Sequence, residues 1–171
     1  YNETTNVFRF DGVNWTDVAG LPEPRWWQGA GVLNGILYAL GGINMGSAKA
    51  EVFQYDGTNW TTAASLPESR YNMVVATLGG YLYSVGGMTG GDVIHTNVFR
   101  FDGANWTDVA GLPELRTGQG GGVLGGYLYV FGGRDGSGLK TNAYRFDGVS
   151  WTEVAGMPVA RANMGYATLD N

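Results

Sequence analysis

One short motif occurs four times in this chain at nearly constant spacing. Asp-Gly-x-Asn-Trp stands at 11–15, 56–60 and 102–106, and Asp-Gly-x-Ser-Trp stands at 147–151. The four tryptophans are separated by 45, 46 and 45 residues; they are Trp15, Trp60, Trp106 and Trp151. A period of this length is typical of repeat proteins, in which each unit buries its apolar faces only against its neighbours. The sequence therefore predicts a row of packed, similar units.

Two further features recur with the same period. A Leu-Pro or Met-Pro pair comes three residues before an arginine in every repeat, giving Arg25, Arg70, Arg116 and Arg161. A double glycine closes a short apolar run in three repeats, giving Gly41, Gly42, Gly86, Gly87, Gly132 and Gly133. We expect these residues, like the four tryptophans, to have structural roles: the arginines bonding to carbonyl oxygens of neighbouring strands, and the tryptophans packing one unit on the next.

Each repeat has the composition of four short strands. In the repeat that begins at Arg25 we expect strands at 29–33, 36–40, 52–55 and 60–63, with a hairpin turn at Asn34-Gly35 and a polar, glycine-rich loop at 43–50. No segment shows the apolar periodicity of a helix. Four-stranded antiparallel units at this spacing are typical of β-propeller blades. A sandwich or a solenoid would not require the same residues at the same offsets.

The ordered set of recurring residues resembles the kelch repeat. It consists of Arg25, the run 36–42 ending in Gly41-Gly42, the strand 52–56 ending in Tyr-Asp, Trp60, and then Leu66-Pro67. The resemblance covers essentially the whole chain and implies an all-β, kelch-type propeller of about four repeats. It implies much less about activity, because function lies in sites added to a fold.

Alternate repeats are more alike than adjacent ones. Residues 5–25 and 96–116 are identical at 19 of 21 positions, so the stronger period is 91 residues. We place the blade units at 1–24 (the second half of a blade), 25–69, 70–115, 116–160 and 161–171 (the first strand of a blade). Three interpretations stay open: a piece of a longer propeller, a unit that forms a ring with copies of itself, or a four-bladed ring. As an isolated chain we expect it to be marginally stable or self-associated.

Composition excludes several classes of protein. The net charge is −5 and the 10 basic residues form no cluster, so no nucleic-acid partner is expected. No apolar run is long enough to span a membrane. The chain has no cysteine and one histidine, which excludes disulfides, thiolate metal sites and the cysteine-crosslinked tyrosine of kelch-like copper oxidases. The repeated aspartates each stand without a second carboxylate at ligand spacing, so we expect no metal and no cofactor.

Residues that do not recur are the better candidates for binding. In a propeller, the loops between second and third strands share one face with the crossovers between blades; here these loops are 43–50, 88–95 and 134–141. Adjacent aromatic side chains on such a face suit a protein hot spot or sugar stacking. The candidates are Trp26, Trp27, Asn44, Met45, Tyr71, Asn72, Asp92, His95, Arg134 and Asp135. For Trp26 and Trp27 the alternative is that one of them fills a blade interface.

These residues favour a binding module without catalysis, with a protein or glycan partner. One alternative is a sugar mutarotase of kelch-like fold, which requires carboxylates and an arginine converging in the channel. Asp92, Arg134 and Asp135 are the residues that could serve. A second alternative is a purely structural array. Location outside the cell or on its surface is slightly favoured over the cytoplasm.

Overall fold

The computed structural model describes residues 4–167 and shows three complete four-stranded antiparallel blades. The first blade contains β3 (Gly29–Leu33), β4 (Ile36–Leu40), β7 (Val52–Tyr55) and β8 (Trp60–Ala63). The second contains β9 (Val74–Leu78), β10 (Tyr81–Val85), β13 (Val98–Phe101) and β14 (Trp106–Val109). The third contains β15 (Gly120–Leu124), β16 (Tyr127–Phe131), β19 (Ala143–Phe146) and β20 (Trp151–Val154). The four strands predicted for the repeat that begins at Arg25 are confirmed.

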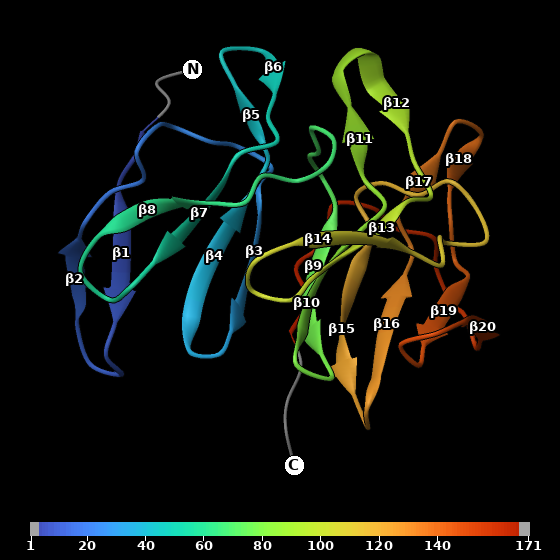
Figure 1. Cartoon of the computed structure of the whole chain (residues 1–171). Helices are drawn as coiled ribbons and strands as arrows, with labels where there is room; N and C mark the ends of the chain where they lie inside the picture. Colours follow the sequence, from blue (N-terminus) through green and yellow to red (C-terminus); the bar gives the residue numbers. More distant parts are fainter. Residues whose placement is uncertain (1–3, 168–171) are drawn as a thin grey trace.

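Two strands precede the first blade. β1 (Val7–Phe10) pairs with β2 (Trp15–Val18) through the same register that joins the third and fourth strands of each blade. This N-terminal hairpin therefore corresponds to the outer half of a blade. Figure 1 shows the hairpin at one end of the row of blades and β19–β20 at the other, so the described residues do not close into a four-bladed ring.

The segments between second and third strands are not irregular loops. Each contains a two-stranded ribbon: β5 (Ile43–Asn44) with β6 (Ser47–Ala48), β11 (Met88–Thr89) with β12 (Val93–Ile94), and β17 (Arg134–Asp135) with β18 (Gly138–Leu139). A single 3₁₀ turn, Gly90–Asp92, connects β11 to β12. The expectation of a loop was wrong because backbone pairing across two or three residues needs no apolar run in the sequence. The ribbons project from one end of the blades, which we name the ribbon face (Figure 1).

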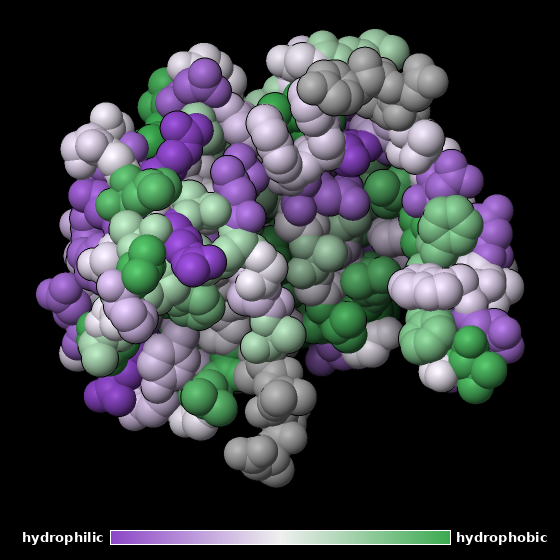
Figure 2. Space-filling view, turned by 180° about the vertical axis from the view of Figure 1, so that it is seen from behind, coloured by the Kyte–Doolittle hydropathy of each residue, from purple (hydrophilic) through white to green (hydrophobic). Residues whose placement is uncertain are grey.

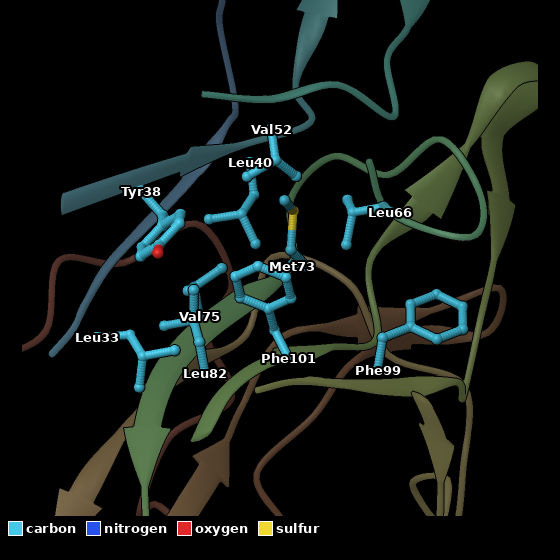
Figure 3. Packing of buried hydrophobic residues seen from close by; sticks show 10 residues of the cluster. All are labelled: Leu33, Tyr38, Leu40, Val52, Leu66, Met73, Val75, Leu82, Phe99 and Phe101. Carbon is cyan, nitrogen blue, oxygen red and sulfur yellow. The ribbon is translucent and has the colours of Figure 1, made fainter. Parts of the chain in front are cut away.

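The core lies between blades. One buried cluster joins the first and second blades, and a second cluster joins the second and third. Figure 3 shows the former, in which the ring of Tyr38 meets that of Phe101 edge-on at 5.5 Å between centroids. The next interface repeats this contact with Tyr83 and Phe146 at 5.7 Å. Each blade thus depends on its neighbour for burial of its apolar face, as the repeat period predicts.

Recurrent tryptophans connect successive blades. The indole nitrogens of Trp60, Trp106 and Trp151 each donate a 2.8 Å hydrogen bond to the carbonyl oxygen of an alanine 41 or 42 residues earlier. Trp15 has the same local structure but is 70% exposed. Its indole makes no hydrogen bond within the described residues, because no preceding blade lies beside the N-terminal hairpin in this structure.

The double glycines form the second connection. Gly42 N, Gly87 N and Gly133 N each donate to the carbonyl oxygen of the arginine that begins the next repeat, at 2.7–2.8 Å. Gly41 has φ +56°, and a Cβ there would lie 2.1 Å from the Arg70 carbonyl oxygen. A side chain is therefore excluded by backbone conformation and by space.

The arginines differ in their partners. Arg116 Nη1 donates to the carbonyl oxygens of Gly132 (2.6 Å) and Asn142 (3.2 Å), as expected from the sequence. All three guanidinium groups pair with the glutamate two residues earlier, namely Glu23, Glu68 and Glu114, and for Arg25 and Arg70 no bond to a carbonyl oxygen is formed within the described residues. Arg161 is exposed. The first strand expected at 161–171 is not formed over 161–167, and 168–171 lie outside the described residues.

Candidate functional site on the ribbon face

The residue after each arginine is attached to a ribbon. Trp26, Tyr71 and Thr117 form antiparallel bridges with Ile43, Met88 and Arg134, the first residues of the three ribbons. Backbone hydrogen bonds of 2.8–3.1 Å run in both directions across each bridge. The ribbon face therefore has a fixed backbone, and its variable side chains are carried by strands rather than by free loops.

Three aromatic rings stack where the first and second blades meet. The Trp27 ring stacks on Trp26, with 5.0 Å between centroids and 9° between planes, and on Tyr71, with 6.0 Å and 16°. Trp26 and Tyr71 also pack on the buried cluster formed with Ile43 and Met88. Trp27 remains 52% exposed. Of the two adjacent tryptophans, Trp26 is thus the one packed in the interface, and Trp27 is the one presented to solvent.

Trp27 belongs to a backbone ladder that crosses all blades. Asn72 N donates to Trp27 O (3.0 Å), Gly118 N to Asn72 O (3.1 Å), and Asn163 N to Gly118 O (2.7 Å). All four residues have left-handed φ, between +53° and +60°. Glycine and asparagine adopt this conformation readily, whereas a tryptophan is strained by roughly 1–2 kcal/mol. A strained aromatic residue held half-exposed is a feature of ligand-contacting positions.

The ladder borders a polar funnel of about 300 Å³. Amide side chains from four repeat units line it together with two methionines. The lining residues are Trp27, Gln28, Asn72, Met73, Gly118, Gln119, Asn163, Met164 and Tyr166. Only Trp27 and Asn72 among these were candidates from the sequence. The others, except Tyr166, carry a weak signal that could have found them: they lie two or three residues after the arginine of their repeat.

The remaining candidates lie on the ribbons or beside them. The Tyr71 hydroxyl donates to Asp92 Oδ1 at 2.7 Å, and burial together with this carboxylate raises the pKa of Tyr71 to about 12. His95 contacts Thr89 Oγ1 at 3.0 Å, and burial with the nearby Arg70 lowers its pKa. This lowered pKa favours the neutral form of His95.

Asn44 and Met45 are adjacent but have opposite environments. Asn44 is buried and donates to Glu23 Oε2 at 2.5 Å, so its side chain is bonded to the segment that leads into the first blade. Met45, at the tip of the first ribbon, is 87% exposed. The other two ribbons also expose apolar side chains, Val93 and Leu139. The ribbon face therefore presents scattered apolar groups around its aromatic stack.

The charged candidates do not converge. Asp92 bonds to Tyr71, whereas Asp135 pairs with Lys140 Nζ at 2.6 Å, and the bonds from Lys140 and Ser137 lower the pKa of Asp135. Arg134 lies against the Met88 sulfur. No hydrogen bond joins Asp92, Arg134 and Asp135 in the described part of the chain, so the arrangement that a mutarotase requires is not assembled there. Over residues 4–167, no group of three or more acidic or histidine side chains is placed to hold a metal.

Repeated four-stranded blades, packed face to face and connected by tryptophan and double-glycine contacts, define a β-propeller scaffold. The profile of the Kelch motif matches residues 69–113 and 115–158, just over half of the chain. This protein belongs to the kelch-repeat family, and the resemblance seen in its sequence is confirmed.

Similarity to solved structures supports the fold alone. The structure of YjhT superposes with a TM-score of 0.82 at 16% identity, over 92% of this chain and 61% of that one. The chain thus spans about three fifths of the length of that protein. No curated protein sequence matches it. Among the described residues there is no helix with the length and apolar character needed to cross a membrane.

Proposed function

We propose that this protein is a binding module without catalysis whose partner docks on the ribbon face. The observation that carries the proposal is Trp27, a half-exposed tryptophan held in a strained conformation between two stacked rings. Tryptophan and tyrosine dominate the binding energy of protein interfaces. The rings of Trp26 and Tyr71 fix the Trp27 side chain before any partner arrives, which reduces the entropy lost on binding.

A protein is the partner that the surface supports best. Exposed apolar side chains on all three ribbons, Met45, Val93 and Leu139, surround the stack. An aromatic centre with apolar neighbours and a polar rim is the usual composition of a protein interface. A glycan is the second candidate, supported by the amides of Asn72 and Asn163 beside Trp27 in the funnel, because sugars combine ring stacking with hydrogen bonds to amides.

The proposal is tested by comparing two variants at exposed positions. Trp27→Asn removes the ring and installs the residue found at the equivalent positions 72 and 163. Val149→Asn, in the exposed turn between β19 and β20 at the end opposite the ribbons, is the matched control. Each immobilised protein is exposed to the proteins of its source and to a panel of glycans.

We expect ligands that bind wild type and Val149→Asn to bind Trp27→Asn at least about 30-fold more weakly, the loss typical of a hot-spot residue. Recovery of proteins would identify the first class of partner, and retention of glycans the second. Equal binding by all three forms would overturn the assignment of the ribbon face.

A further inference from the structure

Each of the two ends of the described chain exposes an apolar surface. At the third blade, an apolar hollow of about 500 Å³ is bordered by Tyr129, Phe131, Val154, Ala155 and Met157. At the other end, the N-terminal hairpin exposes Phe8, Phe10 and Trp15. Figure 2, seen from behind, shows a separate hollow with apolar residues, which lies between the N-terminal hairpin and the first blade and belongs to neither of these two surfaces. No other part of the described residues covers the exposed side of the hairpin. In the hollow of the third blade, the C-terminal segment at Tyr166 and Ala167 forms part of the lining, with the Tyr166 ring against Phe131.

The internal interfaces show what each exposed group would contact. Tyr38 meets Phe101 of the next blade and Tyr83 meets Phe146, always 63 residues apart. Tyr129 is the equivalent tyrosine of the third blade, and its counterpart phenylalanine is Phe10. Phe10 stacks on Trp15 as Phe101 does on Trp106.

The hydrogen bonds of the tryptophans give the same correspondence. Trp60, Trp106 and Trp151 donate to the carbonyl oxygens of Ala19, Ala64 and Ala110, each at the first position after the fourth strand of the preceding unit. The next alanine in this series is Ala155, which borders the hollow. Among the four recurrent tryptophans, Trp15 is the one whose indole has no acceptor within the described residues. One donor and one acceptor are thus left over, at opposite ends.

We propose that the hollow of the third blade binds the N-terminal hairpin of a second copy of this chain. In this interface Phe10 packs against Tyr129 of the other copy and the Trp15 indole donates to its Ala155 carbonyl. The contact uses two different surfaces and so joins copies head to tail, giving a closed ring where the rotation allows and an open row otherwise. It continues the geometry of the two interfaces already present inside each chain.

The same geometry limits the affinity. In the proposed contact, the hairpin of one copy packs against the third blade of another. This hairpin corresponds to the third and fourth strands of a blade. No counterpart of β10 is present beside that hairpin in the described residues. The buried area is therefore smaller than between complete blades, and we expect a dissociation constant in about the micromolar range.

Two variants at exposed positions separate the two surfaces. Trp15→Ala disables the hairpin and leaves the hollow intact, whereas Ala155→Arg fills the hollow and leaves the hairpin intact. Val149→Arg, equally exposed and outside both surfaces, is the control. The mass of each 171-residue protein is measured by sedimentation equilibrium over a range of concentrations, and circular dichroism verifies folding.

We expect wild type and Val149→Arg to associate as concentration rises, and Trp15→Ala and Ala155→Arg to remain monomeric when alone. An equimolar mixture of these two variants contains one intact pair of surfaces and should stop at a dimer. Wild type that stays monomeric up to high micromolar concentration would overturn the proposal. So would folded variants that associate like wild type, or a mixture that forms no dimer.

Discussion

The indole nitrogen of Trp106 lies 2.8 Å from the carbonyl oxygen of Ala64, which is 42 residues earlier and in the preceding blade. The Trp106 ring also stacks on the Phe101 ring, with 4.7 Å between their centroids. One side chain thus connects the fourth strand of a blade, its own third strand and the preceding unit. The same hydrogen bond recurs with Trp60 and Trp151, so each tryptophan joins its blade to the preceding unit.

Trp60→Ala should lower the free energy of unfolding by about 3 kcal/mol, because truncation removes a packed aromatic ring and its hydrogen bond to Ala19. Trp15→Ala is the matched control. It changes the same motif where the ring is exposed, so at low protein concentration the expected loss is under about 0.5 kcal/mol. Urea unfolding of both variants measures the difference. Equal losses would show that contact with the preceding blade is not the source of stability.

Gly41→Ala should cost about 3 kcal/mol or more, since its Cβ would overlap the Arg70 carbonyl oxygen of the next repeat. Gly79→Ala is the control, because it introduces the same backbone strain without a steric overlap. Gly79 has φ +58°, nearly that of Gly41, and has nothing within 4 Å of its Cβ position. We expect only the strain of about 1 kcal/mol there. Thermal melts that shift equally for the two variants would contradict a steric role for the double glycine.

Trp27→Asn should leave the free energy of unfolding within about 1 kcal/mol of wild type. Loss of stacking on Trp26 and Tyr71 costs about 0.5–1.5 kcal/mol per pair, and relief of the left-handed conformation returns roughly 1–2 kcal/mol. Differential scanning calorimetry of the variant and of wild type measures the net change in stability. A fall in melting temperature as large as that of Trp60→Ala would indicate that Trp27 serves stability rather than binding.

Acid should weaken the turns that join third and fourth strands. Backbone N–H groups of Asn59 and Thr58 donate to Asp56 and lower the pKa of its carboxyl below the ordinary value of 3.8. A depressed folded-state pKa contributes stability that is present above 3.8 and is lost as pH falls through the folded value. Asp56→Asn retains the acceptor oxygen without the charge.

The melting temperature of wild type should therefore exceed that of Asp56→Asn near neutral pH, and the difference should shrink steadily below about pH 4. The other three repeat aspartates titrate in both proteins and so cancel in the comparison. A difference that stays constant from neutral pH to strong acid would show that the charge of Asp56 contributes nothing to the turn.

The scaffold could be predicted from the sequence because its determinants are local and repeated. Asn34-Gly35 specifies a hairpin turn, and Gly41-Gly42 recurs where a neighbouring carbonyl approaches. The ribbons could not be predicted, because segments such as Asn44–Ser47 pair through backbone groups alone. The funnel was also missed, since the ladder that builds it joins residues about 45 positions apart whose side chains differ.

The candidate site was predicted in outline but not in its chemistry. Trp27 and Tyr71 do come together, although they belong to different repeats. Asp92 and Asp135 do not, because each carboxylate is engaged by a nearby partner, Tyr71 in one case and Lys140 in the other. Such pairing depends on the curvature of each ribbon, which a sequence of glycines and polar residues does not specify.

The ladder through Trp27, Asn72, Gly118 and Asn163 has a consequence for the speed of recognition. The amides of Asn72, Gly118 and Asn163 are each hydrogen-bonded to the preceding unit. The backbone beneath the aromatic stack therefore cannot open at one of these positions without breaking contact between blades. Hydrogen exchange at Asn72 and Gly118 should accordingly require sub-global opening rather than local fraying. A partner would meet a preorganised surface, and its association rate would be set by diffusion and orientation rather than by a conformational change of the propeller.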